Sequence, residues 1–206
     1  YRALASLTAT VADPAWVPPH FRIASVLAPF WPSDDGGVRL ALTLRPTSLS
    51  SHKGQISFPG GRRDPSDPDL AFTALREANE ELGISPSAVR QMVRLDDAWS
   101  VQGYLVAPHV GWLDHAPSIV PSPAEVERVI IADVEALMRP EIHRPQIVEH
   151  GGQRWTVHYY HYEGDVIWGM TAGILSRLFR LLHAEPLLED SVGVDSLRRF
   201  VSEQTR

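Results

Sequence analysis

Three glutamates within residues 76–83 constrain this chain more than any other feature of its sequence. Glu77, Glu80 and Glu81 stand at i, i+3 and i+4, a spacing that puts their carboxylates on one face of a helix. Each like-charge pair costs about 0.2–0.5 kcal/mol, and the last two also meet the unfavourable end of the helix dipole. A bound cation reverses the sign of these terms. The run therefore indicates either a metal-holding helix or, as the alternative, an ordinary acidic surface.

The neighbouring residues predict where this helix begins and ends. Asp67 is placed to cap its N-terminus, with Pro68 at the first helical position, where a missing N–H has no cost. Gly83 is placed to end it in the left-handed conformation. An apolar stripe at helical spacing is formed by Ala71, Leu75, Ala78 and Leu82. Ala71, Ala74 and Ala78 are small and predict close packing on a sheet, with the carboxylates roughly opposite the stripe.

A glycine-rich segment precedes the helix and reads Phe58-Pro59-Gly60-Gly61, followed by Arg62 and Arg63. We predict a turn here, because glycine permits positive φ and the close approach of another backbone. A glycine loop with exposed N–H groups and basic neighbours, leading into an acidic helix, suits a phosphate that a metal ion bridges to the protein.

Together the loop and the helix resemble the Nudix box, Gly-x5-Glu-x7-Arg-Glu-(apolar)-x-Glu-Glu-x-Gly-(apolar). The second half, from Arg76 to Ile84, fits without a mismatch. The first half departs, because the first acidic position falls on Asp67 and eight residues, not seven, separate it from Arg76. A one-residue insertion in the loop explains the difference. The resemblance implies an α/β fold, the Nudix α/β/α sandwich with a mixed sheet, and a hydrolase that needs a divalent cation.

The composition excludes several classes of protein. With 206 residues, 44% of them hydrophobic, the chain is long enough for a sizeable core, and we expect a single Nudix domain over 1–206, with its core at about 22–182 and an extension at each end. A net charge of −6 provides no basic surface for nucleic acid. The absence of cysteine excludes disulfides and thiolate metal sites. No apolar run approaches the roughly 18 residues of a membrane span and no signal peptide is visible, so a cytoplasmic location is expected.

The rest of the chain alternates short apolar segments with turns. Strands are predicted over 21–29, 38–45, 55–58, 91–101, 104–113, 126–131, 147–150, 154–162 and 166–168. Besides the acidic helix, helices are predicted over 4–11, 132–138, 169–183 and 194–201. Several strands with a few flanking helices favour a mixed sheet between helical layers, which agrees with the sandwich that the resemblance implies.

A second resemblance lies upstream of the glycines. Residues 42–45 read Leu-Thr-Leu-Arg, Leu49 follows, and residues 52–61 read His-Lys-Gly-Gln-Ile-Ser-Phe-Pro-Gly-Gly. This is similar to the extra signature of the coenzyme A pyrophosphatase subgroup of Nudix enzymes, with one departure at Ser50, where the subgroup usually has arginine. Residues 125–127 and 167–172 also resemble the subgroup. The resemblance implies hydrolysis of coenzyme A or acyl-CoA to 3′,5′-ADP and (acyl-)4′-phosphopantetheine.

The chemistry of a pyrophosphate explains why such an enzyme needs these acids. Mg²⁺ or Mn²⁺ on oxygen ligands neutralises the diphosphate and activates a bound water. Glu77 and Glu81 are the predicted metal ligands, with Glu80 next, and Glu77 and Glu80 are also catalytic candidates. Arg76 is a further catalytic candidate, expected to orient a neighbouring carboxylate by a charge-assisted hydrogen bond.

Outside the box, Glu125 and then Glu127 are candidates for the extra glutamate that Nudix enzymes often use as ligand or base. The substrate-binding candidates are the two loop glycines and nearby basic residues: Arg45, His52, Lys53, Gly60, Gly61, Arg62 and Arg63. For each basic residue the alternative is an ordinary surface cation, and for His52 also a structural histidine. The aromatic run at 158–162 could stack an adenine, but alternating residues in a strand more often pack in a core, which we favour.

Two other functions stay open. The substrate could instead be ADP-ribose or a dinucleotide such as NADH, or the chain could be a Nudix-like module that senses a nucleotide without hydrolysing it. The complete set of three glutamates argues against the sensing module, because binding alone does not need all of them. In each case the expected partner is a small molecule, and the sequence gives no indication of oligomeric state.

Overall fold

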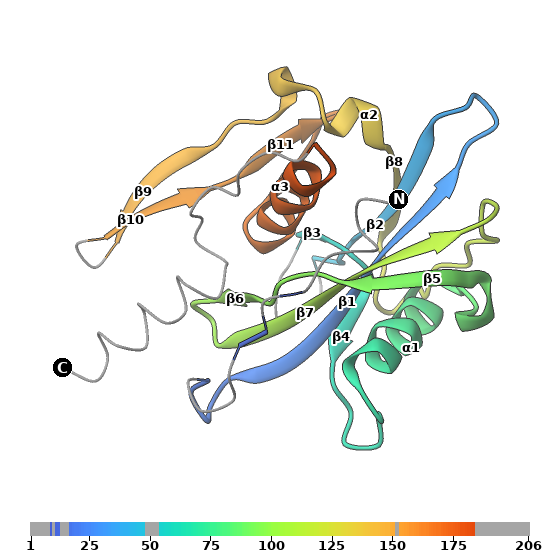
Figure 1. Cartoon of the computed structure of the whole chain (residues 1–206), viewed down its shortest axis with the longest axis horizontal. Coiled ribbons are helices and arrows are strands. Elements are labelled where there is room, and N and C mark those ends of the chain that lie inside the picture. Colours follow the sequence, from blue (N-terminus) through green and yellow to red (C-terminus); the bar gives the residue numbers. More distant parts are fainter. Residues whose placement is uncertain (1–8, 10, 13–16, 48–53, 151–152, 184–206) are drawn as a thin grey trace.

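A mixed β-sheet forms the centre of the molecule (Figure 1). The computed structural model describes residues 9, 11–12, 17–47, 54–150 and 153–183. Within these residues the sheet comprises β1 (Arg22–Pro32), β2 (Val38–Leu44), β3 (Ile56–Ser57), β4 (Gly60–Arg62), β5 (Val89–Arg94), β6 (Ala98–Ser100), β7 (Tyr104–Leu113) and β8 (Arg128–Asp133). The main order is β3-β2-β1-β7-β5, with β4, β6 and β8 paired to β1, β7 and β2. The β1–β7 pair is parallel and the others are antiparallel, so the predicted mixed sheet is confirmed.

Helices cover both faces of this sheet (Figure 1). On one face α1 (Leu70–Leu82) packs through Ala74 and Ala78, which are fully buried against Leu27 of β1. On the other face α3 (Met170–Leu182) packs through Leu175 and Leu178. The small side chains of α1 allow its backbone to approach the sheet closely. The α/β/α layering expected from the sequence is therefore present.

Two antiparallel hairpins accompany α3. One joins β9 (Gln146–His150) to β10 (Gln153–Val157), and the other joins β11 (Tyr159–Tyr162) to β12 (Asp165–Trp168). A short helix, α2 (Val134–Leu137), follows β8, and single 3₁₀ turns occur at Pro86–Ala88 and Pro140–Ile142. No helix in the described part of the chain is long and apolar enough to cross a bilayer.

The structure corrects several predicted elements. Gly60–Arg62 is a strand paired with β1 rather than a turn, and the missing Cβ of Gly60 lets this strand lie directly against the backbone of Ser25 and Val26. The strand expected over 154–162 is interrupted at His158, where the chain changes from pairing with β9 to pairing with β12. The strand expected over 91–101 is likewise divided into β5 and β6. The helix expected over 194–201, and nearly all of the one over 4–11, lie outside the described residues.

The two ends of α1 differ in how well the sequence predicts them. The N-cap is Asp69, whose side chain accepts the Phe72 N–H at 2.7 Å, so the prediction of Asp67 as cap is wrong. At the other end Gly83 adopts φ 69°, and its N–H reaches the Asn79 carbonyl at 2.8 Å, as predicted. The acidic run of the sequence is therefore the C-terminal half of a well-capped helix.

Candidate active site

Glu77 lies against the backbone of β4. A Cβ at Gly61 would stand 2.5 Å from the carboxyl carbon and both oxygens of Glu77, so the absence of a side chain there makes room for this carboxylate. The Glu77 side chain is only 15% exposed. Burial raises its pKa, against the opposing effect of Arg76, which donates to Glu77 Oε1 at 2.9 Å. Glu77 is thus a largely desolvated carboxylate facing the glycine strand.

Glu81 is the most buried acid of the group, with 3% of the residue exposed. Its Oε2 has no hydrogen-bond partner among the described residues, and the guanidinium Nη1 of Arg45 lies 3.7 Å from Oε1. Burial raises the pKa of Glu81 to about 8, although Arg45 opposes that rise and the Gly60 backbone hydrogen bond opposes it weakly. The prediction that the carboxylates lie opposite the buried face is wrong here, because α1 packs on β4 as well as β1 and the buried arc includes Glu81.

Glu125 joins these acids from the loop before β8. Its negative charge raises the pKa of both Glu77 and Glu81, so three carboxylates from two segments share one electrostatic environment. Unlike the other two, Glu125 is exposed to solvent. The second candidate is Glu127, next to Arg128, whose pKa is raised mainly by its hydrogen bond to Asp165 and to a smaller extent by Glu127. Among the described residues, no electrostatic effect of Glu127 on Glu77 or Glu81 is seen.

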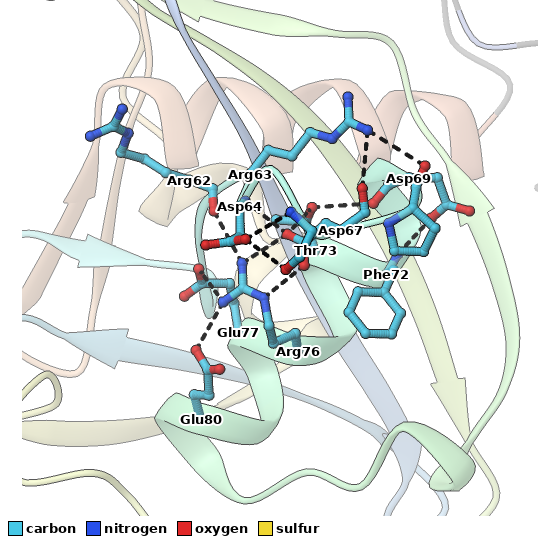
Figure 2. Close-up of polar contacts among 12 residues, drawn as sticks. Arg62, Arg63, Asp64, Asp67, Asp69, Phe72, Thr73, Arg76, Glu77 and Glu80 are labelled. Atoms are coloured by element: carbon cyan, nitrogen blue, oxygen red, sulfur yellow. Dashed lines mark hydrogen bonds and ion pairs between the residues drawn. The ribbon is translucent and has the colours of Figure 1, made fainter.

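Arg76 connects the acids to the preceding loop (Figure 2). Its Nη1 donates to Glu77 Oε1 and Glu80 Oε2, each at 2.9 Å. Its Nε and Nη2 bind the two oxygens of Asp67 at 3.0 Å, and Nη2 also donates to the Arg62 carbonyl at 3.1 Å. An arginine has five N–H donors, and these five contacts match that number. Arg76 therefore orients protein groups and has no donor left for a ligand.

Asp67 is a buried anchor rather than a helix cap. It is 2% exposed and accepts hydrogen bonds from the Asp64 N–H at 2.9 Å and the Thr73 hydroxyl at 2.8 Å, in addition to Arg76. The Arg76 guanidinium holds the pKa of Asp67 well below its usual range. The extra residue in the loop before α1 therefore still allows a direct ion pair between Asp67 and Arg76. No pattern in the sequence pointed to that pairing.

The basic candidates are distributed over separate places. Arg45 is half-buried beside Glu81. The Arg62 guanidinium points away from Arg76 and Glu77 (Figure 2) and lines a cavity of about 560 Å³ together with Arg22 and Arg63. Arg63 also donates to the Asp67 carbonyl at 3.0 Å. His52 and Lys53 lie outside the described residues.

These residues fit a hard divalent cation. In the described ranges no three acidic or histidine side chains already stand as a complete metal cage. Mg²⁺, however, is usually held by one or two carboxylates and completed by water and substrate phosphate oxygens. Glu77 and Glu81 supply oxygen donors, one of them the unpartnered Oε2, in a place where each negative charge disfavours the other. The donor set excludes sulfur-seeking metals and suits Mg²⁺ or Mn²⁺.

Known proteins are similar to this chain in sequence and in fold. The profile described as NUDIX domain matches residues 22–155. The chain is 38% identical over 169 residues to Nudix hydrolase 15, mitochondrial, of Arabidopsis thaliana, which covers 79% of this chain and 59% of the relative. It is 33% identical over 154 residues to the peroxisomal coenzyme A diphosphatase NUDT7 of Mus musculus, which covers 72% of this chain and 65% of the relative.

A solved structure supports the fold independently. The Nudix hydrolase RenU from M. smegmatis superposes with a TM-score of 0.55 at 18% identity, covering 82% of this chain and 89% of that one. The chain spans only about three fifths of the length of the Arabidopsis relative. The profile match nevertheless includes β4, α1 and the segment that carries Glu125. The chain therefore belongs to the Nudix hydrolase family.

Proposed function

We propose that this chain is a metal-dependent pyrophosphohydrolase that cleaves the internal pyrophosphate of coenzyme A or acyl-CoA. The observation that carries the proposal is the pair Glu77 and Glu81, two largely buried carboxylates held side by side against a glycine strand without enough positive charge to neutralise them. Two like charges at this separation repel each other, and a divalent cation bound between them would make the arrangement favourable. The products would be 3′,5′-ADP and 4′-phosphopantetheine or its acyl form.

Each residue of the site has a separate proposed role in hydrolysis. A divalent cation, when bound, neutralises the diphosphate and lowers the pKa of a water molecule. Glu77 and Glu81 would hold that cation, and Arg76 fixes the positions of Glu77 and Glu80 by hydrogen bonds. Arg45, beside Glu81, is placed to offer positive charge to a phosphate oxygen. Glu125 is exposed and next to the same acids, so it is the candidate to accept the proton of the attacking water.

Two observations support coenzyme A as the substrate. Residues 42–61 resemble the signature of coenzyme A pyrophosphatases, and Arg45 within that segment reaches Glu81 in the structure. In addition, one relative that is 33% identical carries the name coenzyme A diphosphatase. The segment that resembles a substrate signature thus contacts, through Arg45, one of the acids proposed to bind the metal.

The test is product analysis after incubation of the purified chain with coenzyme A and either Mg²⁺ or Mn²⁺. We expect release of 3′,5′-ADP, with dephospho-CoA, ADP-ribose and NADH turned over more slowly. Faster turnover of ADP-ribose or NADH would favour the alternative substrates, and no product from any of the four with either metal would refute the proposed activity. If wild type and Glu77→Gln both bound coenzyme A without cleaving it, the chain would be a binding module.

Gly61→Ala provides a second test. The three heavy atoms nearest to the added Cβ all belong to the carboxyl end of the Glu77 side chain, so we expect the helix to keep its place while the carboxylate is displaced. A displacement of about 1 Å near the reacting atoms can cost about 100-fold in rate. Steady-state kinetics should therefore show a loss of at least about tenfold in kcat/KM, with a thermal midpoint close to that of wild type.

Gly60→Ala is the matched control for that substitution. A Cβ at position 60 would meet the Ser25 carbonyl at 2.5 Å, and this backbone cannot swing aside. The control should therefore lose stability as well as activity. Full activity in Gly61→Ala would show that Glu77 does not need its present position against β4.

A further inference from the structure

An aromatic cavity lies on the α3 side of the sheet, at the end of β2. Its volume is about 510 Å³, and its walls include Leu44 and Ile56 from the sheet and Tyr159, Val166 and Trp168 from the β11–β12 hairpin. The aromatic cavity is open on one side. None of its residues takes part in the acidic site described above.

The hairpin that forms one wall separates its aromatic residues by face. Tyr160 and Tyr162 are buried in the core at 2% and 6% exposure, as favoured for the aromatic run from its sequence. Tyr159 points to the other face, where it is paired across the hairpin with Trp168. The two rings lie within 10° of parallel, with centroids 6.5 Å apart. The prediction that the aromatic run packs in the core is therefore confirmed for Tyr160 and Tyr162. It does not account for Tyr159, which lies on the other face of the hairpin.

Trp168 is too exposed for a residue that serves only the core. Nearly half of it, 46%, is accessible, and Val166 beside it is 42% exposed. A tryptophan ring aligned with a tyrosine at the edge of an open cavity offers a flat π-surface, which favours a planar ring as the occupant. A long acyl chain would gain more from a closed apolar channel than from this open wall.

The aromatic cavity and the acidic site meet at one strand end. Leu44 lines the cavity, and the next residue, Arg45, lies beside Glu81. The carbonyl of Leu44 accepts the N–H of Glu127 at 2.9 Å, which fixes the segment of Glu125 to the same place. A ligand that occupies the cavity can therefore extend around the end of β2 toward the acids.

We propose that the aromatic cavity binds the adenine ring of the substrate, stacked on Tyr159 and Trp168, while the diphosphate extends toward Arg45 and Glu81. Asp165, which lines the same cavity and is held by Arg128 at 2.7 Å, provides an acceptor for the exocyclic amine of the base. The direction of the diphosphate rests on the proposed function. The adenine assignment does not depend on coenzyme A, because ADP-ribose and NADH carry the same base.

The test is to measure binding of the two product halves, 3′,5′-ADP and 4′-phosphopantetheine, by calorimetry in Mg²⁺. Stacking on one aromatic side chain is worth roughly 1–3 kcal/mol, so Trp168→Ala should weaken 3′,5′-ADP binding by about 5- to 150-fold. Binding of 4′-phosphopantetheine should be unchanged. Trp168→Phe keeps a flat ring and should recover most of the lost affinity, which separates stacking from misfolding.

Phe72→Ala is the matched control, because Phe72 is an aromatic residue of α1 with a similar exposure of 47%. Phe72→Ala should leave the affinities for 3′,5′-ADP and for 4′-phosphopantetheine unchanged. No measurable binding of 3′,5′-ADP or AMP to wild type, or weaker binding of 4′-phosphopantetheine alone in Trp168→Ala, would overturn the adenine assignment. Failure of coenzyme A hydrolysis would not affect this measurement, so the two proposals fail separately.

Discussion

Glu81→Gln is expected to abolish hydrolysis and, at the same time, to stabilise the metal-free protein at alkaline pH. Loss of an outer partner of a metal ligand typically costs 10- to 100-fold in affinity or activity, so loss of a ligand itself should cost more than about 100-fold in kcat/KM. The stabilisation arises because the amide removes a negative charge from a place that is almost closed to solvent.

The sign of the pH effect follows from the raised pKa of Glu81. Burial raises the pKa of Glu81 from its ordinary value of 4.5 to about 8. The folded state holds the Glu81 proton more tightly than the unfolded state. The protonated carboxyl therefore adds to the free energy of unfolding below pH 4.5, and this contribution is lost as pH rises through about 8. In chelator, wild type should therefore lose on the order of a few kcal/mol across this range through this group, and Glu81→Gln should not.

Thermal unfolding in EDTA at pH 5 and pH 9 measures this difference. We expect Glu81→Gln to exceed wild type by several degrees at pH 9, and we expect added Mn²⁺ to stabilise wild type more than the variant. Glu135→Gln, at an exposed position in α2, is the control and should follow wild type. A parallel pH dependence for Glu81→Gln and wild type would show that Glu81 is not the titrating group.

Asp67→Ala is expected to be the most destabilising single change in the loop before α1. Asp67 is almost fully buried and accepts two of the five hydrogen bonds that Arg76 donates. Its removal leaves a partly buried guanidinium without its main counter-ion. Denaturant unfolding should show a clearly larger loss of stability than the removal of a single helix cap, because four hydrogen bonds to Asp67 are lost together. Activity should fall because Arg76 no longer holds Glu77 and Glu80 in place.

Asp69→Ala is the matched comparison, two residues away in the same loop. It removes only the N-cap bond to Phe72, which is worth about 1 kcal/mol. The sequence assigned the cap to Asp67, and the structure assigns it to Asp69. An equal or larger loss in Asp69→Ala would mean that the ion pair between Asp67 and Arg76 adds little to stability.

Local signals predicted the elements that depend on local interactions. The helix, its end at Gly83 and its packing through Ala78 and Leu82 follow from local signals, and the structure confirms them. Ala71 and Leu75 of the predicted stripe are only partly buried. The burial of Glu81 could not be predicted in this way, because it depends on β4 lying over the helix. The contact between Arg45 and Glu81 joins residues far apart in the sequence, so no spacing rule could detect it. The family resemblance suggested Glu125 as a further ligand or base; its negative charge reaches Glu77 in the structure, and its role in the reaction stays a prediction.

The saturated guanidinium of Arg76 has a consequence for how this site can vary. Five acceptors from three segments depend on one side chain, so substitutions at Asp67, Glu77 and Glu80 cannot act independently. Lysine, with three donors on a single nitrogen, cannot replace the planar fork. A substitution at one of these acids therefore changes the hydrogen bonds that Arg76 makes to the other two.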